Sequence, residues 1–464
     1  MNNGLRHHEP PGTEAWAREN TALAFIVSGV AWMVVGTCFG FLGGVQLVGP
    51  DLIGKIPWLT FGRVRAMHTN MVMFGFVVTT LVGVGFHIVP RLARTPLFSE
   101  RLGLASVFTW NLSLLAGVVA LGLGYTQSRE YAELFWPSDL GIVFTFVLML
   151  YNLTSTVMRR REPLLYVSIW YIVGGLFLAA GVYIIGNVIW VPWKGALHGM
   201  PDAIVAWFYG HNVVGLIMTP LAIGAAYYII PRAAGAPLYS HTLSLIGFWS
   251  ILVMYTHIGT HHLLQTPAPT WLKLISIVDS IAMIIPVATV LVNLWMTARG
   301  RMALVTGDIG ARFIFVGTIL YLFVCIQGPF QSLPVVQRIT HFTNWVPAHA
   351  HLAVLGFAGM SAWGAIYYLL PAMTGRAIHS RGLAVLHYWL MLFGVSSMMV
   401  VLTIAGLIQG HAWYHGEVVY RVLPEMYVYN ITRVMAGALV VTASVVGLYN
   451  VIRSLAGRPR EVVP

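Results

Sequence analysis

The sequence predicts an all-α, polytopic membrane protein with twelve transmembrane helices. Of its 464 residues, 58% are hydrophobic and only 9% are charged, whereas soluble domains carry about 25% charged residues. Its apolar runs are about 20 residues or longer, which is the length of a membrane-spanning helix and excludes an outer-membrane barrel. No linker or low-complexity segment divides the chain, so we expect residues 1–464 to form one transmembrane domain that begins with a cytoplasmic tail over residues 1–20.

Short connections rich in Pro, Gly and Arg separate the predicted spans. In chain order, the spans are Thr21–Val48, Val64–Val89, Leu102–Leu123, Leu140–Met158, Leu164–Trp190, Ala203–Ile230, Leu243–Leu264, Trp271–Met296, Phe313–Pro329, Phe342–Leu370, Leu383–Ile408 and Met426–Ile452. The ninth of these is unusually short for a helix that crosses a bilayer.

The connections also predict the orientation in the membrane. Arginines follow every even-numbered span: Arg91, Arg94, Arg101, Arg159, Arg160, Arg161, Arg232, Arg299, Arg301, Arg312, Arg376, Arg381, Arg453, Arg458 and Arg460. The opposite connections carry more acidic residues. The positive-inside rule therefore places both termini in the cytoplasm, and it explains the net charge of +11 without a nucleic-acid partner.

The two cysteines exclude several redox centres. Cys38 and Cys325 are far apart in the sequence, and both lie in apolar runs. They cannot form a disulfide framework, an iron–sulfur cluster, a covalent haem attachment or a thiolate copper site. Any metal or haem in this chain must therefore rely on other ligands.

A group of histidines is predicted to lie at one depth inside the membrane. Given the alternating direction of the spans, all of them fall in the outer half of the bilayer: His68, His211, His261, His262, His349 and His351. Polar side chains at membrane depth are costly and usually functional, and imidazole is a common ligand of haem and of transition metals. We therefore interpret this layer as a buried site for several cofactors.

Helical geometry separates the possible ligands of two haems. His349 and His351 are two residues apart, so their side chains point roughly 200° away from each other and serve different groups. His351 and His68 can hold a six-coordinate haem between them. His349 can hold a five-coordinate haem whose other face stays open for a small molecule.

The remaining imidazoles can bind a non-haem metal. His211 lies in the sixth span, and the adjacent His261 and His262 lie at the end of the seventh. Adjacent residues on a regular helix diverge by about 100°, so the pair can reach one metal only if the helix loosens there, shortly before Pro267. Three nitrogen ligands suit copper, although they exclude neither iron nor zinc.

Several motifs surround these histidines. They are Gly62-Arg-Val-Arg-Ala-Met-His68-Thr, Gly124-Tyr-Thr-Gln-Ser-Arg-Glu130-Tyr-Ala-Glu133, Trp207-Phe-Tyr-Gly-His211-Asn, Tyr255 with His261-His262-Leu, and Trp345 to His349-Ala-His351. Together they make nearly the whole chain resemble subunit I of the haem-copper oxidase superfamily, and specifically the cbb3-type cytochrome c oxidases. The resemblance implies a subunit I-like helix bundle.

The resemblance also implies cofactors and a reaction. It implies low-spin haem b on His68 and His351, high-spin haem b3 on His349, and copper B on His211, His261 and His262. It implies a terminal respiratory oxidase that reduces O2 to water, coupled to proton uptake and translocation, in the plasma (inner) membrane of a bacterial or archaeal-type cell. No haem c or copper A motif is present, so membrane-anchored c-type cytochrome subunits, or another electron-donor subunit, are expected partners.

Three further residues are expected at the site. Tyr255 precedes His261 by six residues, so it lies on roughly the same helix face. The resemblance implies that this tyrosine is joined covalently to His211 and supplies an electron and a proton for cleavage of the O–O bond. Arg65 lies one turn before His68 and can pair with a haem propionate. Glu133 is implied as a ligand of calcium between haem propionates.

One departure from the cbb3 pattern, together with the motifs His349-Ala-His351-Leu-Ala and His68-Thr-Asn70, which also resemble those of nitric oxide reductases, leaves a nitric oxide reductase as an alternative. Gln327 stands where cbb3-type enzymes usually carry a glutamate. Nitric oxide reductases, which convert NO to N2O, usually bind a non-haem iron with a glutamate four residues after the first histidine, but that position here is Gly215; they also lack the tyrosine that is present as Tyr255. A twelve-span transporter is a third hypothesis, although no inverted repeat is visible. Asp279, an acid inside the eighth span, has no role that the family assigns.

Overall fold

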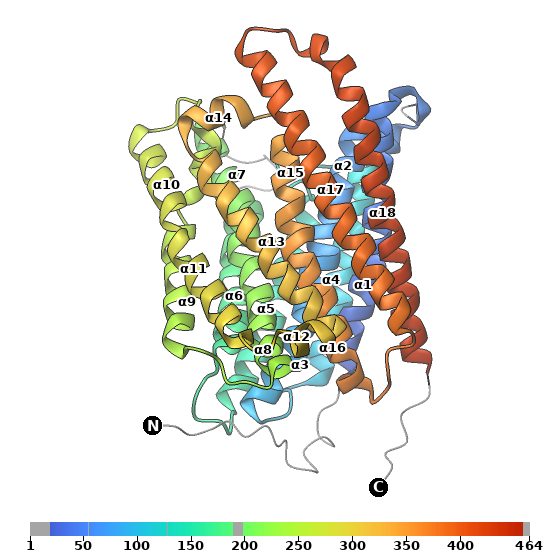
Figure 1. Ribbon diagram of the computed structural model, residues 1–464, viewed down its shortest axis with the longest axis vertical. Helices are drawn as coiled ribbons and strands as arrows, with labels where there is room; N and C mark the ends of the chain where they lie inside the picture. The colour runs from blue at the N-terminus through green and yellow to red at the C-terminus, as the bar shows by residue number, and fades with distance from the viewer. Residues whose placement is uncertain (1–18, 54, 128, 189–197, 458–464) are drawn as a thin grey trace.

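All twelve predicted spans are confirmed in the computed structural model, which describes residues 19–53, 55–127, 129–188 and 198–457 (Figure 1). Twelve helices in this part of the chain are long and apolar enough to cross a membrane. Most of the expected tail 1–20 lies outside the described residues, as do the end of the fifth predicted span, Arg458 and Arg460. Because the number of spans is even, the described chain begins and ends on the same side of the bundle.

The helices follow the apolar runs closely, with several runs built from more than one segment. The first part of the chain forms α1 (Asn20–Val48), η2 (Pro50–Leu52), η3 (Pro57–Leu59), α2 (Phe61–Asn70), η4 (Met71–Val78), α3 (Thr79–Ala93), α4 (Glu100–Leu123) and α5 (Trp136–Met158). The middle part forms α6 (Val167–Tyr183), η5 (Ile184–Val188), α7 (Met200–Asn212), η6 (Val213–Met218), α8 (Thr219–Ala234), α9 (His241–Tyr255), η7 (Ile258–Leu263), α10 (Thr270–Ala282) and α11 (Ile284–Ala298). The last part forms α12 (Met302–Gly307), α13 (Ile309–Gln331), α14 (Pro334–Thr340), α15 (Trp345–His351), η8 (Leu352–Gly359), α16 (Met360–Thr374), α17 (Arg381–Tyr414), η9 (Val419–Val422) and α18 (Leu423–Ala456).

Several spans are longer than the sequence predicts, among them the ninth, the eleventh and the twelfth. The ninth, α13, has 23 residues because its start is capped by Asp308, whose carboxylate accepts a hydrogen bond from the Ala311 backbone. Helices α17 and α18 have 34 residues each and continue past the apolar runs, so that they reach beyond the other helices at one end of the bundle (Figure 1). Hydropathy alone cannot detect helical turns that lie beyond the apolar segment.

The second, sixth and tenth spans form the centre of the bundle. Their most apolar windows are 89–100% buried inside the protein, whereas those of the other nine spans are 33–50% buried. These central spans carry His68, His211, His349 and His351. Each of them changes from α-helix to π-helix shortly after its histidines, at η4, η6 and η8, and such π segments are rare and frequently found at functional sites.

An internal threefold repeat, which the sequence analysis missed, explains why the central spans are equivalent. At the end of the bundle opposite the histidines, one serine in each repeat caps a helix start: Ser99, Ser240 and Ser380. An asparagine side chain then forms hydrogen bonds with both the backbone N–H and the backbone C=O of that serine, an arrangement that we call a clasp. These asparagines are Asn152, Asn293 and Asn450. One turn after each asparagine, the hydroxyl of a threonine or serine accepts a hydrogen bond from the backbone N–H of the residue just before the capping serine. These residues are Thr156, Thr297 and Ser454. These nine hydrogen bonds are 2.7–3.1 Å long.

Removing one of these clasps should lower stability measurably. Asn293→Ala deletes the hydrogen bonds that the amide makes with both the N–H and the C=O of Ser240, and Asn293 is fully buried. We expect a loss of about 2 kcal/mol in the free energy of unfolding, measured as a lower thermal midpoint of the solubilised protein. Thr442→Ala, on an exposed helix face, is the control; equal midpoints for the two variants would contradict a structural role for the clasp.

Candidate functional site

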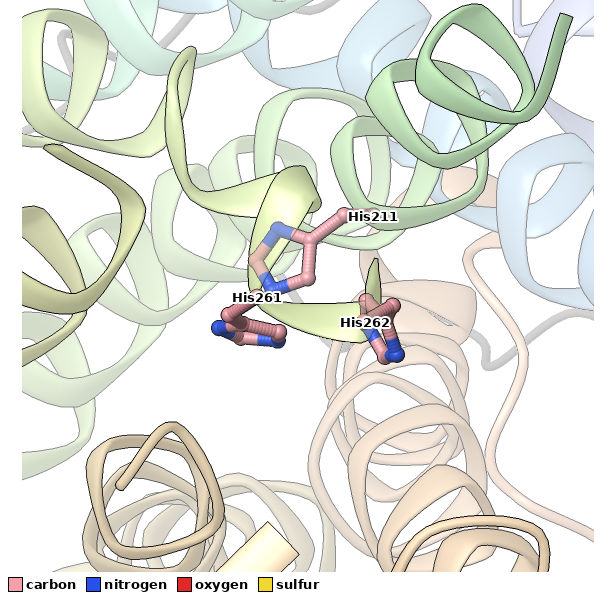
Figure 2. Close-up of side chains that lie close together, drawn as sticks. All are labelled: His211, His261 and His262. Atoms are coloured by element: carbon pink, nitrogen blue, oxygen red, sulfur yellow. The ribbon is translucent and has the colours of Figure 1, made fainter. Parts of the chain in front are cut away.

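Three histidines from two elements meet inside the bundle. His211 lies at the end of α7, and His261 and His262 lie in η7 (Figure 2). Each offers a ring nitrogen, and the three nitrogens lie within 4.8 Å of one another. The ring centroids are 4.5–5.6 Å apart. The structure therefore brings together the three residues that the sequence predicts as ligands of a non-haem metal.

The local backbone differs from the expected loosened helix. Helix α9 ends at Tyr255, and the chain then tightens into the 3-10 turn η7. The ring of His262 stacks on that of Trp207, with centroids 3.9 Å apart and an interplanar angle of 11°. The side chain of Gln337, from α14, donates a hydrogen bond to the backbone carbonyl of His261. Contacts from two other helices thus hold the adjacent histidines on one centre.

Unpaired ring nitrogens indicate that this centre fits a metal. His211 Nδ1 and His261 Nε2 are buried and have no hydrogen-bond partner among the described residues. Buried polar side-chain atoms are nearly always paired, so two unpaired imidazole nitrogens in one cluster need an explanation. A metal ion bound by neutral imidazoles supplies it, since such an ion takes a lone pair from each ring.

Tyr255 packs directly against this cluster. Its ring centroid lies 4.6 Å from that of His211. The space that it fills exists only because residue 215 is glycine: a Cβ added to Gly215 would lie 1.7 Å from a carbon of the Tyr255 ring. A glutamate at position 215, as the nitric oxide reductase alternative requires, cannot coexist with this placement of Tyr255.

A methyl group at position 215 should therefore be costly. In Gly215→Ala, either the Tyr255 ring or the π segment η6 must move, and we expect a loss of about 1–3 kcal/mol in unfolding free energy. Gly181→Ala is a matched control in another span, since nothing lies within 4 Å of its added Cβ. Thermal unfolding of both variants measures the difference, and an unchanged midpoint for Gly215→Ala would contradict the packing described.

His68 and His351 face each other across the centre of the bundle. Their ring centroids are 6.2 Å apart and their planes differ by 22°. A haem iron between the two rings would require two metal–nitrogen bonds of about 2 Å each. Adding the distance from each nitrogen to its ring centroid gives a separation of this size. His68 Nδ1 lies 2.7 Å from the backbone carbonyl oxygen of Gly36, and His351 Nδ1 lies 2.7 Å from that of Pro347. A carbonyl can only accept, so Nδ1 carries the proton and Nε2 is free to bind iron.

A cavity of about 400 Å3 adjoins these two rings. Gly40 is part of its wall, and a Cβ there would lie 2.5 Å from the His68 ring, so glycine is required for the histidine to take this position. Arg65 and Arg433 also line the cavity, and guanidinium groups are suited to carboxylates such as haem propionates. The cavity, its two histidines and its cations fit a six-coordinate haem.

Arg433 is a site residue that the sequence analysis missed. It lies within the predicted span Met426–Ile452, where an arginine is a conspicuous exception to the apolar pattern. Ionisable side chains at membrane depth are functional candidates by default. That rule alone, applied to the twelfth span, would have identified it.

His349 lies on the same helix as His351 but has different contacts. Its Nδ1 lies 3.2 Å from the side-chain oxygen of Gln327 in α13, and its ring is nearly parallel to that of Trp345. The amide oxygen of Gln327 accepts a hydrogen bond from Nδ1–H, which leaves Nε2 as the ligand atom. The residue that departs from the cbb3 pattern therefore contacts the predicted ligand of the five-coordinate haem.

Arg65, Glu130 and Glu133 line a second cavity of about 330 Å3. Arg65 pairs with Glu130, and Asn70 donates a hydrogen bond to Glu133. Burial and the nearby charge of Glu130 raise the pKa of Glu133 to about 7.

The surroundings of Glu133 do not form an oxygen-rich cage. Arg63 and Arg129 line the same cavity, and the described part of the chain has no cluster of three acidic side chains there. Side chains alone therefore do not supply the roughly six to eight oxygen ligands that calcium takes. The calcium ligand at Glu133 stays a prediction.

Other polar side chains also lie within the spans. Asp279 lies 3.3 Å from the ring of His257 and forms an ion pair when that ring is protonated. Tyr171, Tyr227 and Tyr321 are almost completely buried, and the rings of the first two are 5.6 Å apart. No role was predicted for these tyrosines from the sequence, because they come from three separate helices, α6, α8 and α13.

Comparisons with known proteins agree with this geometry. The family of cytochrome c and quinol oxidase polypeptide I matches residues 20–439. The cbb3-type cytochrome c oxidase subunit CcoN1 of Stutzerimonas stutzeri is 32% identical over 451 residues, which cover 94% of this chain and 95% of the relative. A nitric oxide reductase polypeptide of the same organism is 25% identical over 420 residues, or 84% of each chain. A cryo-EM structure of a haem-copper terminal oxidase dimer superposes with a TM-score of 0.80 at 18% identity, covering 96% of this chain and 85% of that one.

Proposed function

The chain belongs to the haem-copper oxidase subunit I family, and from that premise we propose that it is the catalytic subunit of a cbb3-type respiratory oxidase that reduces O2 to water. The observation that carries this proposal is the contact between Tyr255 and His211 beside a cluster of three imidazoles. That contact depends on Gly215, and it removes the place where a nitric oxide reductase would carry its glutamate ligand. Identity also favours the oxidase over the reductase.

The proposed cofactor assignment follows the histidine contacts. His68 and His351 would hold low-spin haem b, His349 would hold high-spin haem b3, and His211, His261 and His262 would hold copper B. When bound, these groups supply the electrons and the binding positions that dioxygen reduction requires. His349 and His351 are two residues apart on α15, so a single rigid helix would hold the ligands of both haems.

Tyr255 is proposed as the proton and electron donor at the reaction site. Its ring lies against that of His211, so its hydroxyl would carry a proton close to the proposed metal. Fixed contact with a metal ligand lets the phenol give up a proton and an electron together, without a mobile reagent entering from solvent. Tyr171, Tyr227 and Tyr321 are proposed as steps by which protons reach Tyr255 from the opposite end of the bundle.

We propose that electrons come from another subunit. The only two cysteines of the chain, Cys38 and Cys325, are both free, and the sequence has no haem c attachment motif. We propose membrane-anchored c-type cytochromes as donors and a plasma-membrane location with both termini in the cytoplasm. Arg433 and Arg65, on the wall of the cavity beside His68, would hold the propionates of the first haem.

Turnover measurements test the substrate directly. The purified complex, reduced by an artificial donor, should consume oxygen at a rate far above its rate of NO consumption. Oxygen and NO electrodes give both rates on one sample. A preparation that consumes NO rapidly and oxygen only slowly would replace the oxidase with the nitric oxide reductase, and an inactive preparation without haem would favour the transporter.

A further inference from the structure

One ring nitrogen of His261 is held by a serine. His261 is 2% exposed, and its Nδ1 lies 2.9 Å from the hydroxyl of Ser280 in α10, which is equally buried. A hydroxyl can donate or accept, so this contact alone does not define which ring nitrogen carries the proton. The contact differs from those of His68 and His351, whose Nδ1 atoms face backbone carbonyls.

The next contact along α10 determines the direction of the hydrogen bond. The Ser280 hydroxyl lies 2.6 Å from the backbone carbonyl of Ser276. A carbonyl only accepts, so the single hydroxyl hydrogen of Ser280 is directed to Ser276. The Ser280 oxygen must then accept from His261, and Nδ1 carries the proton. A neutral imidazole has only one such proton, so Nε2 of His261 presents a lone pair.

That lone pair belongs to the nitrogen that has no hydrogen-bond partner among the residues that the structure describes. His261 Nε2 is buried and unpaired, and His261 is part of the cluster whose ligand atoms lie within 4.8 Å of one another. We propose that Ser280 is a positioning residue that fixes the tautomer and ring orientation of His261, so that Nε2 is the ligand of the non-haem metal. This inference rests on the proposed function only in assuming that a metal occupies the cluster.

Metal retention tests the proposal. Ser280→Ala removes the acceptor, so Nδ1–H is left without a partner and the ring can take either tautomer. Loss of a partner of this kind typically weakens metal binding roughly 10–100-fold. The purified complex is dialysed against a graded series of a copper chelator, and copper per chain is measured by mass spectrometry. We expect Ser280→Ala to lose half of its copper at a chelator concentration roughly 10–100-fold lower than the unmodified protein requires. The copper that remains should give an altered electron paramagnetic resonance spectrum.

Two variants serve as controls. Ser276→Ala removes a hydroxyl one turn away, which donates to the backbone carbonyl of Lys273. It keeps the backbone carbonyl of residue 276 that orients the Ser280 hydroxyl, so copper retention should match that of the unmodified protein. Ser280→Thr keeps the hydroxyl and should restore retention. If Ser280→Ala does not assemble, as judged by its low-spin haem spectrum, Ser280→Thr is compared with Ser280→Val, which has nearly the same shape but no acceptor.

The possible failures are distinguishable. If the unmodified protein holds copper and Ser280→Ala retains it equally well, or if Thr and Val at position 280 behave alike, the role of Ser280 is overturned and the oxidase proposal stands. If the unmodified protein holds no non-haem metal at all, the proposed function and this inference are both overturned. A tenfold or greater loss confined to variants without the hydroxyl supports the proposal.

Discussion

Replacing Tyr255 with phenylalanine should lower oxygen turnover at least about 100-fold, since a positioned proton donor contributes roughly 10²–10⁴ in rate. The substitution removes one oxygen atom and keeps the ring that packs against His211 and over Gly215. The haem spectra and the copper content should therefore stay unchanged. Oxygen-electrode assays on purified complex, with spectra recorded on the same sample, measure both properties.

A second tyrosine variant separates a specific effect from a general one. Tyr449 is about half exposed in the twelfth span, so Tyr449→Phe should leave turnover close to that of the unmodified protein. Near-normal turnover of Tyr255→Phe would remove Tyr255 from the mechanism, even if the cofactor assignment proved correct.

Replacing His211 with alanine should remove the non-haem metal and leave the low-spin haem in place. His211 is the only ligand of the proposed metal from α7, so its loss leaves just the adjacent pair in η7. The rings of His68 and His351 form a separate pair that His211 does not hold. The copper content per chain should therefore fall to near zero, and oxygen turnover should be lost. The absorption of the low-spin haem should persist.

His241→Ala is the matched control for this prediction. His241 is exposed at the start of α9, at the opposite end of that helix from Tyr255 and η7, so its replacement should change neither copper nor haem. Copper retained at full occupancy in His211→Ala would contradict the ligand assignment. Loss of both haems together with copper would instead indicate that His211 is needed for assembly.

The sequence predicted the twelve spans and the histidine layer because both depend on strong local signals. Apolar runs of about 20 residues are unambiguous, and histidines within such runs stand out. The turn of the helix separated His349 from His351, the family resemblance paired His351 with His68, and the rings of that pair face each other. The structure confirms the spans and brings His211, His261 and His262 together, and the cofactors assigned to the six histidines stay a prediction.

What the sequence did not reveal arises from contacts between spans. Pairing of Arg65 with Glu130 and packing of Tyr255 on Gly215 depend on how neighbouring helices are rotated, which hydropathy does not encode. The tightened turn that places His261 and His262 together is stabilised by Trp207 and Gln337 from other elements. The threefold repeat was visible in principle, since Ser99, Ser240 and Ser380 recur at almost equal spacing, but a search for inverted repeats does not detect it.

The haem and metal content of the purified chain tests the central claim most directly. A pyridine haemochrome spectrum combined with copper and iron analysis should give a pair of b-type haems and a single copper ion per chain. That result would match the facing rings of His68 and His351, the separate site at His349, and the three-histidine cluster. A chain that binds no haem would contradict the entire interpretation, and a full haem complement with non-haem iron in place of copper would contradict the oxidase.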